Sequence, residues 1–320
     1  MTAEPVIVAK DLVKYYKEHG FYGKPRLALD KISLEVRKGE TVALLGPNGA
    51  GKTSLLRILF GLILPSGGEA TVFNAPCSEV SWKNRAGYVP EFFTPPKFLT
   101  GGELLEMGSQ GMSRSDFEKK VDWLNQAIGL KDAMDIRIGR LPRGSIHQLG
   151  LAQALVHDPE LLVLDEPSAN LDAISRKKLK NLLIEFAAKG KTVLISSHIL
   201  SEVEELCTRV IFINKGKVVQ QGKTEDLLGT GGGYLIRFKT PAEMPSQLSR
   251  LGSVVPDPEA GVTAFETRTD TEKDLVVKAL VENGIAIQSL ELRQKTLEEV
   301  FMELLEERML ENYLTKIMAT

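Results

Sequence analysis

The sequence predicts an α/β fold with a parallel sheet, followed by a small α+β domain. Three short runs are almost wholly apolar, as in strands that are buried on both faces of a sheet: residues 41–45, 161–164 and 192–196. A helical pattern at about 174–189 lies between the last two runs, which is the order of a parallel crossover unit. Beyond residue 233 the expected element order is β-α-β-β-α-β, the ferredoxin-like arrangement.

The composition is that of an ordinary globular chain. Of the 320 residues, 43% are hydrophobic and 26% are charged, and the length fits two domains. The formal net charge of −2 argues against a nucleic-acid partner, because proteins that bind phosphate backbones carry concentrated positive charge. Cys77 and Cys207 have no cysteine or histidine at metal-ligand spacing, so we expect free thiols.

We find no segment that predicts a signal peptide or a membrane span. The first residues lack a basic stretch followed by an apolar core. No run approaches the roughly 18 apolar residues that a membrane-spanning helix needs. We therefore expect that the chain does not span a membrane by itself.

The first predicted domain covers residues 1–229. It begins with a short strand at 6–8 and includes a helical subdomain at about 92–157. The helices expected in that subdomain lie at 116–128 and 145–157. Residues 230–233 are predicted to be a linker, because three of these four residues are glycine.

The second predicted domain is a ferredoxin-like unit over residues 234–305. Its helices are expected at 242–251 and 272–282. A last helix is predicted to start at Thr296, because Thr296 and Glu299 have the spacing of a capping box. Residues 306–320 are expected to form a helical tail.

A complete phosphate-binding loop follows the first apolar run. Its glycines let backbone N–H groups approach phosphates closely, and the helix that it opens points its positive end at them. Lys52 is placed to reach the β- and γ-phosphates, and the Thr53 hydroxyl can ligate Mg²⁺. We therefore predict that the site binds ATP and Mg²⁺. The predicted ATP-binding residues of this loop are Gly46, Pro47, Asn48, Gly49, Ala50, Gly51, Lys52, Thr53 and Ser54.

Two adjacent carboxylates end the second apolar run. Asp165 is placed to hold Mg²⁺, either directly or through water. Glu166 would then polarise the attacking water as a general base. An acidic turn after a strand is common, but its occurrence beside a phosphate-binding loop favours the catalytic interpretation.

With these motifs the chain resembles the ABC ATPase family over about residues 6–228. Asp165-Glu166-Pro167 is followed by 168–172, a stretch that looks like the family's D-loop and ends in Asp172. Ser196-Ser197-His198 matches the family's switch histidine. The resemblance implies that His198 contacts the γ-phosphate and holds the attacking water. It also implies that Tyr16 stacks on adenine, with Tyr15 as the alternative.

Two positions depart from the family pattern. Glu91 stands where the family has the Q-loop glutamine; its carboxylate can still ligate Mg²⁺, together with Thr53 and Asp165, and act beside Glu166 and His198 in catalysis. The signature Leu-Ser-Gly-Gly-Gln, which touches the ATP of the opposite subunit, is replaced by a stretch that contains Pro142, Arg143, Gly144 and Ser145.

Pro142 is the departure with the larger consequence. It removes both a hydroxyl and a backbone N–H, and a charge-assisted phosphate contact is typically worth roughly 1.5–3 kcal/mol. One interpretation is a slow but working ATPase. The other is one half of a heterodimer whose partner supplies the intact signature.

Residues 234–305 resemble the accessory domain of drug- and antibiotic-exporter ATPases. The resemblance implies a transporter motor, an exporter, that works as a homodimer or heterodimer with separate transmembrane permease subunits at the cytoplasmic face of the membrane. The segment 92–104, with Phe92, Phe93 and Phe98 expected to be exposed, lies where the family receives the membrane subunit. One alternative is a regulatory ATP-binding module with little turnover. The other is a soluble ABC protein that acts on nucleic acid or ribosomes, which the net charge and the single ATPase domain disfavour.

Overall fold

A computed structural model describes residues 3–17, 25–109, 111–169, 171–229, 233–257 and 259–304. The chain folds into two compact units, Met1–Lys223 and Thr224–Thr320, each of which is described by itself. Three parts of the sequence analysis lie outside the described residues: most of the predicted linker, the tail 306–320, and Asn170 of the D-loop stretch.

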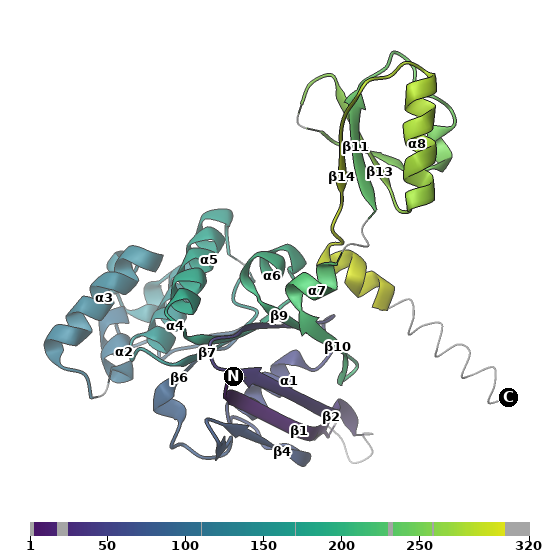
Figure 1. The fold of residues 1–320 in the computed structure, drawn as a ribbon. Helices are drawn as coiled ribbons and strands as arrows, with labels where there is room; N and C mark the ends of the chain where they lie inside the picture. The colour runs from purple at the N-terminus through teal and green to yellow at the C-terminus, as the bar shows by residue number, and fades with distance from the viewer. Residues whose placement is uncertain are drawn as a thin grey trace. The chain divides into compact units, whose positions relative to one another are not determined.

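The first unit is built on a six-stranded sheet of order β10-β9-β3-β8-β7-β6 (Figure 1). Every neighbouring pair is parallel except β10 with β9. The middle strands are buried along their whole length, which confirms the α/β prediction and explains their continuous apolar runs. The strands are β3 (Thr41–Leu45), β6 (Ala86–Val89), β7 (Leu161–Asp165), β8 (Thr192–Ser197), β9 (Arg209–Asn214) and β10 (Lys217–Lys223).

An antiparallel sheet of order β2-β1-β4-β5 packs beside the parallel sheet. Its strands are β1 (Pro5–Tyr16), β2 (Arg26–Arg37), β4 (Gly67–Val72) and β5 (Ala75–Pro76). The predicted strand at 6–8 was too short, because β1 continues to Tyr16 through a shift of register between Ala9 and Leu12. Asp11 has a φ of 49° there, and such a bulge breaks the alternation by which a strand is recognised.

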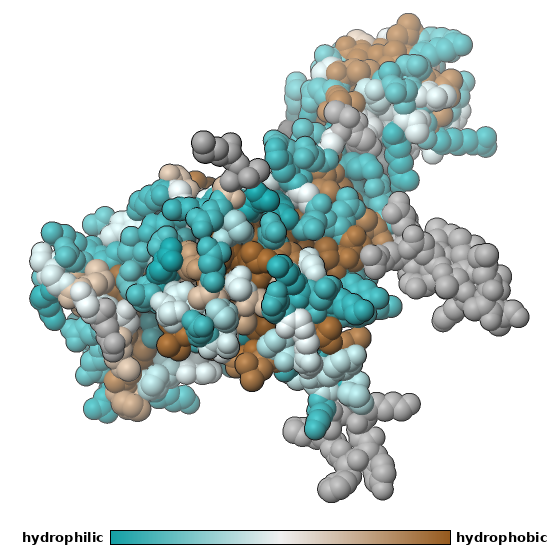
Figure 2. All heavy atoms as spheres, turned by 60° about the horizontal axis from the view of Figure 1, so that its bottom comes forward, coloured by the Kyte–Doolittle hydropathy of each residue, from teal (hydrophilic) through white to brown (hydrophobic). Residues whose placement is uncertain are grey.

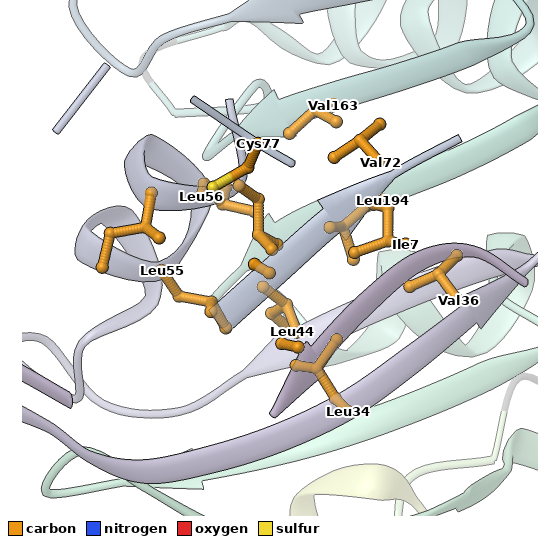
Figure 3. Close-up of a cluster of buried hydrophobic side chains, with 14 of the residues drawn as sticks. Ile7, Leu34, Val36, Leu44, Leu55, Leu56, Val72, Cys77, Val163 and Leu194 are labelled. Atoms are coloured by element: carbon orange, nitrogen blue, oxygen red, sulfur yellow. The ribbon is translucent and has the colours of Figure 1, made fainter. Parts of the chain in front are cut away.

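Helix α1 (Lys52–Leu59) links the two sheets through one apolar core. Figure 3 shows Leu55 and Leu56 of α1 gathered with Ile7, Leu44 and further side chains from both sheets. Side chains of Leu55, Leu56, Ile7 and Leu44 are fully buried. The phosphate-binding loop therefore lies between a buried strand and a helix that is anchored on both sides.

Three of the remaining helices of the first unit form a group that carries the signature segment. In Figure 1, α2, α3 and α4 lie together at one end of the unit. The remaining helices are α2 (Gly101–Gly108), α3 (Arg114–Ile128), α4 (Arg143–Leu155), α5 (Ala173–Ala188) and α6 (Leu200–Leu206). Asp172 accepts a hydrogen bond from the backbone N–H of Ser175 (2.8 Å) and thereby caps the N-terminus of α5.

The second unit is a four-stranded antiparallel sheet of order β12-β13-β11-β14. This is the strand order of a split β-α-β arrangement. Its elements are α7 (Thr224–Leu228), β11 (Tyr234–Lys239), β12 (Ser253–Val255), β13 (Val262–Thr267), α8 (Asp270–Glu282) and β14 (Ile287–Leu292), followed by a helix at 297–304. Thr296 and Glu299 form the reciprocal hydrogen bonds of a capping box before that last helix.

The helix predicted at 242–251 was wrong. The structure has only a 3₁₀ turn at Leu248–Arg250. Pro245 explains the difference, because proline lacks the N–H of an α-helical ladder and its ring clashes with the preceding turn. The carbonyl oxygen of Pro245 accepts the hydrogen bond from the N–H of Leu248 that closes the turn (3.0 Å).

Gly87 tests how closely β6 approaches the signature helix α4. A Cβ on Gly87 would lie 2.1 Å from the carbonyl oxygen of Ala154, and backbone atoms cannot move aside as a flexible side chain can. We expect Gly87→Ala to lower the free energy of unfolding by about 1–3 kcal/mol in chemical denaturation. Gly144→Ala in the same helix, where nothing lies within 4 Å of the added Cβ, is the matched control and should not destabilise. Equal losses in both variants would contradict the close approach.

Candidate functional site

A cavity of about 410 Å³ opens above the loop between β3 and α1. Most residues predicted for the site line it: Tyr16, Pro47, Asn48, Gly49, Ala50, Gly51, Lys52, Thr53, Ser54, Glu91, Glu166 and His198. Arg26, Ala28 and Ala169 also line it and were missed, since Arg26 and Ala28 come from β2 and belong to no motif. Gly46 and Asp165 do not line the cavity but contact residues that do.

Close packing explains two glycines of the loop. A Cβ on Gly46 would lie 2.0 Å from the carbonyl oxygen of Ile213 in β9. A Cβ on Gly51 would lie 2.6 Å from the carbonyl oxygen of Ala28, and Gly51 has a φ of 109°, which only glycine adopts readily. The neighbouring strands therefore hold the loop against the sheet in one shape.

Lys52 is the buried cation of the site. Its side chain is 6% exposed, and its ammonium group donates a 2.6 Å hydrogen bond to the carbonyl oxygen of Gly46. The same Nζ lies 3.1 Å from Oε1 of Glu166, and Oε2 of Glu166 lies 2.6 Å from Nδ1 of His198. Lys52, Glu166 and His198 thus form a continuous line of contacts across the cavity.

The backbone holds Glu166 in an unusual position. Glu166 has a φ of 50°, which costs a residue with a side chain of order 1–3 kcal/mol. Its N–H donates to both the carbonyl oxygen (3.1 Å) and the hydroxyl (2.9 Å) of Ser196 in β8. These two hydrogen bonds fix the turn after β7 and direct the carboxylate toward Lys52.

Asp165 lies beneath the cavity with one carboxylate oxygen unsatisfied. Oδ1 accepts hydrogen bonds from the hydroxyls of Ser196 (2.7 Å) and Thr53 (3.2 Å), whereas Oδ2 is buried and has no partner among the described residues. Burial raises the pKa of Asp165, the two hydroxyl groups lower it, and the charge of Glu166 raises it further, so the net shift is upward. A buried carboxylate in this condition is a place where a cation is favourable.

The donors around Asp165 fit Mg²⁺. Glu91 lines the same cavity, and its pKa is raised by burial and then by the charges of Asp165 and Glu166. A hydroxyl and two carboxylates are hard oxygen ligands, and Mg²⁺ ordinarily completes its six ligands with phosphate oxygens and water. The protein's own donors here are two carboxylates and one hydroxyl, and the described residues contain no group of three or more His, Cys, Asp or Glu side chains that could hold a metal ion by themselves.

Tyr16, rather than Tyr15, lies at the cavity. The hydroxyls of Tyr16 and Ser54 are 3.1 Å apart, and the Tyr16 ring is partly exposed. Lys14 Nζ lies 5.3 Å from the centre of that ring. Tyr15 is 49% exposed and does not line the cavity. Of the two aromatic candidates, Tyr16 has the better position for a base.

The signature segment does not reach the cavity above the phosphate-binding loop of its own chain. Pro142, Arg143, Gly144 and Ser145 are all absent from its lining. Pro142 is the N-cap of α4 and gives the helix no side-chain cap, while its carbonyl oxygen accepts from Ile146 N–H (3.1 Å). The first turn of α4 therefore keeps backbone N–H groups without a capping side chain.

A second, largely apolar groove of about 530 Å³ lies between the loop after β6 and the start of α4. Phe92 lines it and is 71% exposed, and Phe98 nearby is 73% exposed. The expectation that Phe93 is exposed was wrong: it is half-buried, and a Cβ on Gly150 of α4 would lie 2.9 Å from its ring. Glu91 and Ala169 line both the groove and the cavity above the phosphate-binding loop.

The surface and the helices add two observations. Figure 2 shows hydrophobic residues in patches among hydrophilic ones on the face turned to the viewer. None of the helices in the described part of the chain combines the length and the apolarity needed to cross a bilayer.

Comparison with known proteins identifies the family. The profile of the ABC transporter family matches residues 29–169. An ABC transporter ATP-binding protein of Nostoc sp. is 35% identical over 301 residues, which are 93% of this chain and 89% of that protein. The chain belongs to the ABC transporter ATP-binding proteins. A Nod factor export ATP-binding protein of Bradyrhizobium diazoefficiens is 36% identical over 69% of this chain and 72% of its own length.

Solved structures agree with the family. An ATP-binding subunit of an ABC transporter matches with a TM-score of 0.62 and 25% identity over 69% of this chain and 91% of that one. A dimeric bacterial ABC transporter cassette has a TM-score of 0.62 at 24% identity over 68% of this chain and 99% of its own, which shows the fold. The predicted ABC-type fold is therefore confirmed, and this ABC ATP-binding protein places a cavity where its phosphate-binding loop lies.

Substitution of the two neighbouring tyrosines separates their roles. We expect Tyr16→Ala to weaken Mg-ATP binding by about 1–3 kcal/mol, the value of a base stacked on an aromatic ring, as measured by isothermal titration calorimetry. Tyr16→Phe, which keeps the ring, and Tyr15→Ala should bind as the wild type does. A larger loss from Tyr15→Ala than from Tyr16→Ala would assign the base to the other tyrosine.

The raised pKa of Glu91 predicts a pH-dependent stability difference. The pKa of Glu91 in the folded protein exceeds its ordinary value of 4.5, so ionisation of Glu91 lowers the free energy of unfolding. This loss is complete above the raised pKa and absent below the ordinary pKa. We expect Glu91→Gln to raise the Tm at pH 7 to 8, and this gain should shrink to zero as the pH falls to about 4. Glu79→Gln, at an exposed carboxylate outside the cavity, should show no such trend. A gain that is independent of pH would exclude the explanation.

Proposed function

We propose that this chain is the ATP-hydrolysing motor subunit of an ABC exporter. The proposal rests chiefly on Glu166, whose carboxylate lies between Lys52 (3.1 Å) and His198 (2.6 Å) inside the cavity. Beside it, Asp165 has a buried oxygen without a partner among the described residues. A base, an orienting imidazole, a cation for phosphate and a place for a metal ion are the parts that phosphoryl transfer to water requires.

The residues have separate tasks in this proposal. The loop amides from Gly49 to Thr53 and the Lys52 ammonium hold the triphosphate, whose oxygens compete with Glu166 for Lys52. Glu166 then accepts the proton of the attacking water, and His198 orients that water against the γ-phosphate. Thr53, Asp165 and Glu91 would hold Mg²⁺, which neutralises charge on the β- and γ-phosphates when it is bound.

We further propose that two ATP-binding subunits close head to tail. The signature segment lies outside the cavity of its own chain, so its free helix N-terminus is available to a nucleotide on a second subunit. A similar bacterial cassette is described as dimeric. Whether the second subunit is a copy of this chain or a different one depends on how much Pro142 costs.

Separate permease subunits complete the proposed transporter. The groove lined by Phe92, Phe93 and the first turn of α4 is apolar enough to take a helix from a membrane partner, and it shares Glu91 with the ATP cavity. The chain would then lie on the cytoplasmic face, where ATP is available. Export is favoured by the similarity to a Nod factor export ATP-binding protein and by the second unit, whose sequence resembles an exporter accessory domain.

The alternative is an ATP-binding partner or regulatory module with low intrinsic turnover. Pro142 favours it, because the N-cap of α4 offers neither a hydroxyl nor an N–H. In that case Glu166 and His198 would act only when another subunit provides an intact signature.

ATPase measurements decide between these proposals. We expect the wild-type chain to hydrolyse ATP in the presence of Mg²⁺, and Glu166→Gln to lower kcat by about 10²–10⁴-fold because a general base is lost. Calorimetry should show that Glu166→Gln still binds Mg-ATP, and that Lys52→Ala does not. Equal rates for the wild type and Glu166→Gln would overturn the motor proposal for the chain alone.

A second experiment restores the hydroxyl of the signature segment and tests whether two copies of this chain form the composite site. If two copies of this chain form the composite site, Pro142→Ser should raise the rate about tenfold or more, as expected for one regained contact to phosphate. An unchanged rate in Pro142→Ser would instead favour a heterodimer.

A further inference from the structure

The second unit contains a cavity that the proposed function does not use. It has a volume of about 720 Å³ and lies at one end of the sheet. Its walls come from residues 250–253 at the start of β12, residues 266–268 at the end of β13, Glu272 of α8, and residues 293–303 beyond β14. All of these belong to the second unit.

The acidic side chains of this cavity already have partners. Glu266 Oε1 lies 3.1 Å from Nε of Arg293, and Glu299 accepts a 2.7 Å hydrogen bond from the same guanidinium. Glu303 pairs with Lys295 (2.7 Å). Glu272 accepts hydrogen bonds from two backbone N–H groups, those of residues 268 and 269 (2.8 and 3.0 Å). None of these carboxylates is therefore left over to attract a cation.

Two basic side chains, in contrast, make no direct ion pair with any described residue, although the charge of Arg268 acts on the carboxylate of Glu272. Within the described residues, the guanidinium groups of Arg250 and Arg268 make no ion pair, although both residues line the cavity and are exposed. Thr267 lies between these walls; it is 1% exposed, and its hydroxyl has no hydrogen-bond partner in the described chain. A buried hydroxyl without a partner is costly, so such groups usually face a ligand or an ordered water.

We propose that this cavity binds a small anion with a carboxylate or phosphate group. A guanidinium donates two parallel N–H groups to either oxyanion, and Arg250 and Arg268 can do so without breaking an existing ion pair. Bases and acids are balanced in the lining, with four of each, so a polyanion such as nucleic acid gains little there. The polar walls likewise disfavour an apolar ligand.

The test uses the full chain, labelled with ¹⁵N, with Mg-ADP present to fill the ATP cavity. Inorganic phosphate and acetate are titrated separately at constant ionic strength, and the amide signals of Gly252, Ser253, Thr267 and Arg268 are followed by NMR. We expect saturable shifts of these signals. Stronger binding of phosphate indicates a phosphorylated ligand, and stronger binding of acetate indicates a carboxylate.

Variants test whether the binding occurs at Arg250 and Arg268. The double variant Arg250→Gln/Arg268→Gln should weaken the binding at least tenfold and, because neither side chain makes an ion pair, should keep the Tm of the wild type. Lys278→Gln, which removes a positive charge from an exposed lysine of α8 outside the cavity, is the control and should bind as before. The proposal is overturned if NaCl produces the same shifts of these signals without saturation. It is also overturned if the double variant binds phosphate and acetate as tightly as the wild type.

Discussion

The site depends on one buried cation. Lys52 is 6% exposed, and a buried ammonium group is tolerated only when anionic or carbonyl oxygens surround it. The carbonyl oxygen of Gly46 and the carboxylate of Glu166 meet this need, and they follow β3 and β7, two strands that β8 separates in the parallel sheet. The loop after β3 and the turn after β7 are therefore held together by the same charge that would bind the triphosphate. The stability of the site and its affinity for phosphate have a common origin.

The positive charges of Lys52 and Arg57 offset only part of the charge of the carboxylates around the site, because the pKa values of Asp165 and Glu91 stay raised. Asp165, Glu166 and Glu91 lie close enough for the charges of Asp165 and Glu166 to raise the pKa of Glu91, and the charge of Glu166 raises that of Asp165. The excess negative charge is a cost that folding bears in the nucleotide-free protein. A divalent cation removes this cost, so its binding would be favoured by relief of repulsion as well as by coordination.

The sequence predicts the parts of the fold that are contiguous and periodic. The phosphate-binding loop, the buried strands and Asp165-Glu166 could be recognised because each lies within a few residues of the chain. Arg26 and Ala28 could not, because only the pairing of β1 with β2 brings them to the cavity. The bulge at Asp11 concealed most of β1, and Pro245 removed a helix that the apolar pattern favoured. The sequence predicts that Phe93 is exposed. In the structure its ring packs against α4, where Gly150 has no side chain to exclude it.

Glu91 and Ala169 belong to the walls of two hollows at once. A shared wall has a thermodynamic consequence: whatever free energy a nucleotide gains or loses when a partner fills the groove, the partner gains or loses when the nucleotide arrives. Such reciprocity needs no long relay through the fold, since the two volumes share part of their walls. Because Glu91 in the shared wall is ionisable, the coupling between the two volumes is electrostatic as well as steric.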